Sequence, residues 1–99
     1  MPAAIRLGDI CKGHDGFVPR PNDQGSDNVF INSKGAHRLG DHWQTHCNQV
    51  PVCHDSVAGE GSPNVFVNGK KLCRENDKTA CGSPMGLTKS PNVFVNDRA

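Results

Sequence analysis

Apolar residues along this chain fall into short runs, and no run follows the 3.6-residue period of an amphipathic helix. The clearest run occurs three times, as NVFIN at 28–32 and as NVFVN at 64–68 and 92–96. Short segments of β-branched and aromatic residues, bounded by Asn, Ser, Gly and Pro, are typical of strands. The pattern therefore predicts a small, loop-rich, all-β protein.

Each of these runs ends in a pair of turn-forming residues: Asn-Ser at 32–33, Asn-Gly at 68–69 and Asn-Asp at 96–97. Asn-Gly is a strong signal for the type I′ turn of a tight hairpin. We therefore expect three β-hairpins, with strands near 28–39, 64–75 and 92–98 and a further strand near 4–8.

A second element, R-x-[G/N]-D, occurs at 6–9, 38–41 and 74–77. Its third residue is Gly8, Gly40 or Asn76, and these residue types tolerate a positive φ, so a turn is expected. The first copy precedes the first hairpin, so the repeat is circularly permuted. Hairpins too small to bury themselves are expected to pack about a pseudo-threefold axis, as one domain spanning residues 1–99.

The expected strands have two apolar faces. Strand alternation places Phe30, Phe66 and Phe94 on one face. The other face carries the aliphatic residues Val29, Ile31, Val65, Val67, Val93 and Val95. Either both faces form one core, or one forms a flat surface for a partner. The aliphatic set is our candidate for the partner surface.

Composition limits the stability and the partners of the chain. Only 34% of the 99 residues are hydrophobic, so the core is thin and an additional cross-link is expected. The net charge is +1 with scattered basic residues, which argues against nucleic acid as a partner. The start of the sequence has no apolar run typical of a signal peptide, and no 18-residue apolar stretch could span a membrane.

The chain has five Cys, and the absence of a secretion signal favours a reducing compartment, where Cys and His together indicate a metal before a disulfide. A Cys47–Cys53 disulfide is possible only in an oxidising setting. Cys73 lies in a repeat strand, and burial is expected for it.

Position within the repeat selects the candidate metal ligands. His14 and His46 each lie five residues after the aspartate of their repeat, and Cys81 lies four residues after the third aspartate. A pseudo-threefold axis would bring these three side chains together, and the longest loop supplies a fourth, His54. Three imidazoles and one thiolate suit one Zn²⁺ per chain, with Fe²⁺ as an alternative. A complete protein shell indicates a structural site.

The remaining His, Cys and Trp residues near these positions are expected to have structural or surface roles, with one alternative. His42 has no equivalent in the repeats and is expected near the ligands or on the surface, and His37 is expected to be structural. Trp43 is expected to pack within a loop. Cys47 or Cys53 could replace a neighbouring histidine as ligand, since both flank the predicted site.

Several motifs in register make the whole chain similar to the PAAR-repeat family. They are AIRLGDICKGHDG at 4–16, AHRLGDHWQTHC at 36–47, VCHDS at 52–56, GSPNVFVNGK at 61–70 and NDKTACGSP at 76–84. Each motif alone is weak, whereas three copies with His and Cys in place are specific.

This resemblance implies a cone of β-hairpins with a metal near its apex, held by three His and one Cys. Its base would cap the blunt end of a trimeric β-helical spike, one chain per trimer, in a contractile phage tail or a type VI secretion system. The tip would sharpen the spike for membrane puncture and contact the target membrane transiently. The protein would then be located on a virion tail, or be assembled in the bacterial cytoplasm and injected.

Three other classes fit the sequence less well. A zinc-dependent nucleic-acid module would use C-x₂-C pairs, but Cys47 and Cys53 are six residues apart and no basic helix appears. A zinc hydrolase needs an open ligand position and a nearby Glu, but H-x-E and H-E-x-x-H are absent and neither Glu60 nor Glu75 adjoins a predicted ligand. A small zinc-stabilised secreted binding module would require export. A structural spike tip, not an enzyme, is therefore the leading hypothesis.

Overall fold

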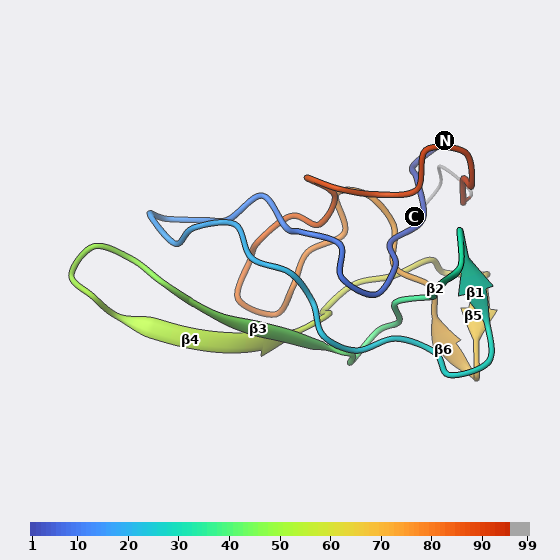
Figure 1. Cartoon of the computed structure of the whole chain (residues 1–99), viewed down its shortest axis with the longest axis horizontal. Coiled ribbons are helices and arrows are strands. Elements are labelled where there is room, and N and C mark those ends of the chain that lie inside the picture. Colours follow the sequence, from blue (N-terminus) through green and yellow to red (C-terminus); the bar gives the residue numbers. More distant parts are fainter. Residues whose placement is uncertain (96–99) are drawn as a thin grey trace.

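The computed structural model describes residues 1–95. Six strands form three two-stranded antiparallel sheets, and these residues contain no helix (Figure 1). The strands are β1 (Phe30–Ile31), β2 (Lys34–Gly35), β3 (His42–Cys47), β4 (Cys53–Val57), β5 (Phe66–Val67) and β6 (Lys70–Lys71). The all-β prediction is confirmed.

Two of the sheets are hairpins predicted from the repeated phrase. β1 pairs with β2 and β5 with β6, and the residues between them have positive φ, 54° at Asn32 and 53° at Asn68. Positive φ in a two-residue loop gives the twist that adjacent antiparallel strands need. The Asn-Ser and Asn-Gly pairs therefore make the turns that the sequence predicted.

The third copy of the phrase pairs with the start of the chain. Phe94 forms a bridge with Ala3, and the amide of Val95 donates to the carbonyl of Pro2 at 2.8 Å. The amide of Ala4 donates to the carbonyl of Val93 at 3.0 Å. The N-terminal segment thus completes the third unit, as circular permutation requires. The turn predicted at 96–97 lies outside the described residues.

The third sheet, β3–β4, is longer than the other two and lies where the sequence predicted a loop. Its strands, HWQTHC and CHDSV, mix polar, aromatic and Cys residues and lack the alternation that marks a half-buried strand. A register shift between Trp43 and His46 further interrupts their pattern. Trp43 accordingly lies in a strand, fully buried, and not in a loop.

Backbone hydrogen bonds show the pseudo-threefold arrangement directly. The amide of Ile5 donates to the carbonyl of Cys73, Cys73 to His37, and His37 to Ile5, at 3.0–3.1 Å. These three residues occupy equivalent positions in the repeat, and all three are fully buried. The three units are therefore joined in a closed ring.

An Arg–Asp ion pair fixes the turn that follows each hairpin. Asp9, Asp41 and Asp77 each accept hydrogen bonds from the backbone amide and the guanidinium of the arginine three residues earlier. The third residue of each turn has positive φ, 87° at Gly8 and Gly40 and 71° at Asn76. The turn predicted from Gly, Gly and Asn is confirmed.

Residues at equivalent positions of the repeated phrase connect neighbouring units. Ser26 Oγ accepts from the amide of Val29 and donates to Asn68 Oδ1 of the next hairpin at 2.7 Å. Arg38 also donates to Asn68 Oδ1, and Asn68 donates to Asn28. The same set of hydrogen bonds, hereafter called the Ser–Asn clasp, recurs with Ser90, Asn32, Asn92 and Arg6. The first and last residues of S-x-N-V-F-x-N therefore hold the hairpins together.

Burial corrects the predicted partner surface. Ile31, Val67 and Val95 are only 4–8% exposed and pack with Ala4, Ala36 and Leu72 in the core, so they cannot form a docking face. Val29, Val65 and Val93 are partly exposed. The described strands β1 and β5 begin after Val29 and Val65, so the two-residue alternation does not extend back to these valines.

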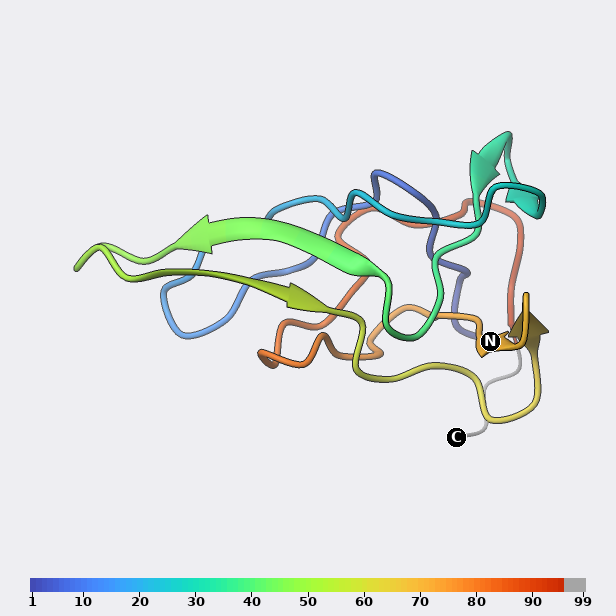
Figure 2. The same ribbon diagram turned by 90° about the horizontal axis from the view of Figure 1, so that it is seen from below.

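The molecule is elongated, with extents of 38 × 26 × 23 Å. The short hairpins lie at one end, hereafter the base, and the turn of β3–β4 lies at the other (Figures 1 and 2). A second cluster of buried residues is separate from the one that contains Ile31: Ile5, Cys11, Trp43, Ala58, Cys73 and Met85. No helix within residues 1–95 is long and apolar enough to cross a bilayer.

We expect Asp41→Ala to lower the free energy of unfolding by about 3 kcal/mol, because it leaves the Arg38 guanidinium without its buried partner. Lys89→Ala, which breaks the more exposed pair with Glu75, should cost less than about 1 kcal/mol. Urea unfolding of the two variants measures the difference. Equal losses would show that the turn pairs do not stabilise the ring.

Candidate metal centre

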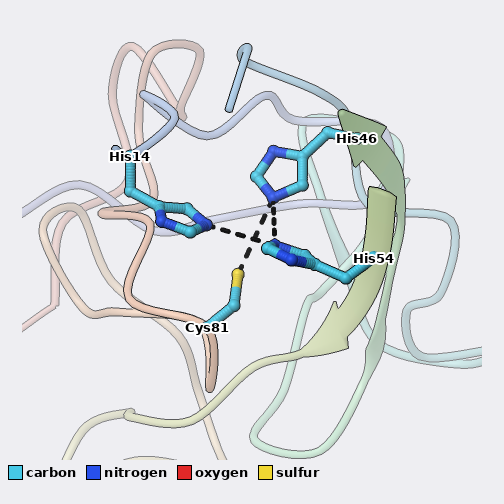
Figure 3. A group of neighbouring side chains, drawn as sticks. All are labelled: His14, His46, His54 and Cys81. Carbon is cyan, nitrogen blue, oxygen red and sulfur yellow. Dashed lines mark hydrogen bonds between the residues drawn. The ribbon is translucent and has the colours of Figure 1, made fainter. Parts of the chain in front are cut away.

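Four side chains from separate parts of the chain converge beyond the second core cluster. They are the predicted ligands His14, His46, His54 and Cys81, whose candidate ligand atoms all lie within 4.8 Å of one another (Figure 3). The structure thus brings together the three residues selected by repeat position and His54 from the longest loop.

Local structure explains how each side chain reaches this point. His46 and His54 face each other across β3 and β4, which places both rings on one side of that sheet. His14 begins a tight turn closed by hydrogen bonds with Phe17 in both directions, with Asp15 and Gly16 at positive φ. Cys81 lies in a turn closed from Gly82 to Thr79.

The distances between the candidate ligand atoms are comparable to those around a tetrahedral ion. His54 Nε2 lies 2.7 Å from His46 Nε2 and 3.2 Å from His14 Nε2, and Cys81 Sγ lies 3.9 Å from His46 Nε2. Around a tetrahedral zinc ion the ligand atoms are roughly 3.3–3.6 Å apart, given its usual bond lengths. The three distances lie on both sides of this range, so small shifts of the side chains would let the four donors enclose an ion such as zinc.

A hydrogen bond orients the imidazole of His46. His46 Nδ1 lies 2.8 Å from the carbonyl of Val18, which can only accept, so Nδ1 carries a proton. The Nε2 lone pair is then free to bind a metal. Phe17 covers the group, with its ring centroid 4.1 Å from that of His54 and 4.8 Å from that of His14.

The Cys81 thiol is prepared to act as a ligand. Burial raises its pKa, but hydrogen bonds from Thr79, Ser56 and Arg20 outweigh this effect and lower the pKa to about 5. Cys81 is therefore a thiolate at neutral pH, the form that binds metals.

Arg20 and Phe17 are contributors that the sequence interpretation missed. Arg20 is almost fully buried and donates to Cys81 Sγ at 3.6 Å and to Cys11 Sγ at 3.1 Å. Its guanidinium also lies over the Trp43 ring. Neither residue lies at an equivalent position in all three repeats, so repeat alignment could not identify them.

The other two histidines stay away from the ligand group. His42 is partly exposed and bridges Asp55 and Asp23, and these two hydrogen bonds raise its pKa. His37 is fully buried, where burial lowers its pKa, and its ring meets Trp43 edge-on. Both observations agree with the surface and structural roles expected of them.

The cysteines outside the group divide into two kinds. Cys11 and Cys73 are buried thiols, as predicted for Cys73, whose pKa burial raises well above its ordinary value. Cys47 and Cys53 form a disulfide, which the sequence interpretation reserved for an oxidising setting. Their register in the unpredicted β3–β4 sheet places them opposite each other, so they bond to each other and do not replace a histidine in this structure.

The chain is similar in sequence to known proteins. Residues 7–86 match the PAAR motif, and the chain belongs to that family. It is also 36% identical over 77 residues to the NAD(P)(+) glycohydrolase toxin Tse6 and to the (p)ppApp synthetase toxin Tas1, both of Pseudomonas aeruginosa. Each match covers 73% of this chain but only 18% and 17% of the respective toxin.

We expect His54→Ala to reduce bound zinc from about one equivalent to a small fraction, since it removes one of four donors. The melting temperature should fall by more than about 10 °C, given about 4–8 °C per kcal/mol for a domain of this size. His42→Ala is the matched control, because His42 lies on the same hairpin outside the group. Elemental analysis and thermal unfolding provide the readouts, and equal metal content in both variants would refute the assignment.

Proposed function

We propose that this protein is a structural spike tip, whose base caps the blunt end of a trimeric β-helical spike with one chain per trimer. The opposite end carries a bound metal and enters the target membrane first. Membership of the PAAR family supports this role.

The observation that carries the proposal is a set of three equivalent aromatic side chains at the base. Phe30, Phe66 and Phe94 are 60%, 54% and 53% exposed, and each has the same place in its repeat. Beside them, Val29, Val65 and Val93 are 38%, 37% and 37% exposed. Matched exposure of large apolar residues in three units suits a partner surface with threefold symmetry.

Hydrogen bonds and ion pairs also preorganise the base for docking. The Ser–Asn clasps and the Arg–Asp turns fix each hairpin relative to its neighbour. A preorganised surface loses little conformational entropy on binding, so more of its apolar contact contributes to affinity. The phenylalanines replace the buried aliphatic residues as the proposed contact set.

The metal has a structural role in this proposal. His14, His46, His54 and Cys81 supply four protein donors, which complete a tetrahedral shell without an open position for substrate. We propose Zn²⁺ as the ion, with Fe²⁺ as the alternative, because imidazole and thiolate suit both. The ion would join three loops at an end of the molecule that lacks a large hydrophobic core.

The two similar toxins favour a type VI secretion system over a contractile phage tail. Both are toxins, and this chain matches less than a fifth of each. We therefore propose a type VI secretion spike over a phage tail, with assembly in the bacterial cell before delivery. The catalytic activities in the relatives' names are not proposed for this chain.

Native mass spectrometry with a trimeric β-helical spike protein should show one chain per trimer. The triple variant Phe30→Asp/Phe66→Asp/Phe94→Asp should weaken binding by at least a hundredfold, because three charges would be buried in an apolar contact. Val18→Asp is the matched control, since Val18 is 55% exposed and adjoins the metal centre. A 3:3 complex, or a triple variant that binds like the control, would refute the capping arrangement.

A further inference from the structure

Two cross-links follow each other along the β3–β4 hairpin. His46 lies opposite His54, and the next pair toward the turn, Cys47 opposite Cys53, forms a disulfide. His46 and His54, two of the four candidate ligands, are therefore each next in sequence to a cysteine of the disulfide. Figure 3 shows the two imidazoles projecting from the same side of this hairpin toward His14 and Cys81.

The disulfide closes the strands immediately beyond the metal ligands. Neighbouring residues on a strand point to opposite faces, so the sulfur atoms lie on the face away from the imidazoles. Past the disulfide, Asn48 organises the turn by accepting from the amides of Val50 and Val52. On the other side of the ligands, the register shift between Trp43 and His46 interrupts the ladder. The disulfide is thus the covalent constraint that holds His46 opposite His54.

We propose that Cys47 and Cys53 are positioning residues for the metal centre, so that metal affinity depends on the redox state of this cysteine pair. With the disulfide formed, the two imidazoles are held at ligand spacing before the ion arrives. With the cysteines reduced, the hairpin end can open and binding must restore the register. Preorganisation of this kind raises the affinity for the metal, because less conformational entropy of the hairpin is lost on binding.

A dithiol reductant carries out the switch. One of its thiolates attacks a sulfur of the Cys47–Cys53 bond and forms a mixed disulfide, which the second thiolate then resolves. Two electrons and two protons pass to the protein, which gains two thiols, while the reductant becomes a cyclic disulfide. Cys53 is exposed to solvent, which permits this attack, whereas Cys11 and Cys73 are fully buried.

The coupling must be reciprocal. If the disulfide raises the affinity for the metal, then the metal stabilises the disulfide by the same factor. Two independent measurements, metal affinity in each redox state and redox equilibrium with and without metal, must therefore agree. A purely structural role for the disulfide in the turn would leave both unchanged.

The inference rests on the proposed metal binding, and Co²⁺ serves as a probe because its spectrum reports the ligand set. We expect the oxidised parent to bind Co²⁺ and Zn²⁺ about 10- to 100-fold more tightly than the dithiothreitol-reduced parent, the range typical of residues that orient metal ligands. The double variant Cys47→Ser/Cys53→Ser should match the reduced parent and should not respond to dithiothreitol. Band positions of the Co²⁺ complex should be the same in all forms, since the three imidazoles and one thiolate are retained.

Equal metal affinity in the oxidised and reduced parent would overturn the coupling while leaving the metal centre intact. A stronger sulfur-to-cobalt band after reduction would also overturn it, because Cys47 or Cys53 would then be a ligand. An oxidised parent that binds neither ion would refute the metal centre itself. If the double variant does not fold, the parent is titrated in glutathione buffers of different redox ratio, and the fraction with the Cys47–Cys53 disulfide is measured with and without Zn²⁺. A midpoint of this titration that Zn²⁺ does not change would refute the proposal.

Discussion

A closed ring of backbone hydrogen bonds among Ile5, His37 and Cys73 is the constraint on which the architecture depends. Each amide in the ring donates to the preceding unit, so no unit can be placed without its neighbours. The ring requires the N-terminal segment to lie beside the last repeat, and Phe94 pairs with Ala3 for this reason. Turn pairs and Ser–Asn clasps then repeat around the same axis with nearly equal geometry.

The two ends of the molecule satisfy different requirements. At the base, small apolar residues fill the space around the axis, and hydrogen bonds from Ser, Asn and Arg hold the hairpins. Farther along, the segments between units differ in length and only one of them forms a long hairpin. Side chains of unequal loops cannot form a symmetric core, so a group of three histidines and one cysteine lies there together with one disulfide.

The sequence predicted those features that repeat. Three copies of one phrase identified the hairpins, and equal offsets from Asp9 and Asp41 identified His14 and His46. Features that occur once were harder to predict, because β3 and β4 lack alternation, Arg20 has no counterparts and the disulfide depends on the register of that sheet. The buried Ile31 shows a further limit, since a two-residue strand is too short for alternation to decide which face is covered.

The single long hairpin has a consequence for geometry on a symmetric partner. On the trimeric spike that we propose as its partner, a base with three equivalent units would sit in three rotations that differ by a third of a turn. These rotations are equal in energy at the base, and their number favours association by about 0.6 kcal/mol through statistics alone. The β3–β4 hairpin, however, points in a different direction in each rotation. Assembled particles would therefore form a mixture of three orientations, and imaging that imposes threefold symmetry would blur this hairpin while leaving the base sharp.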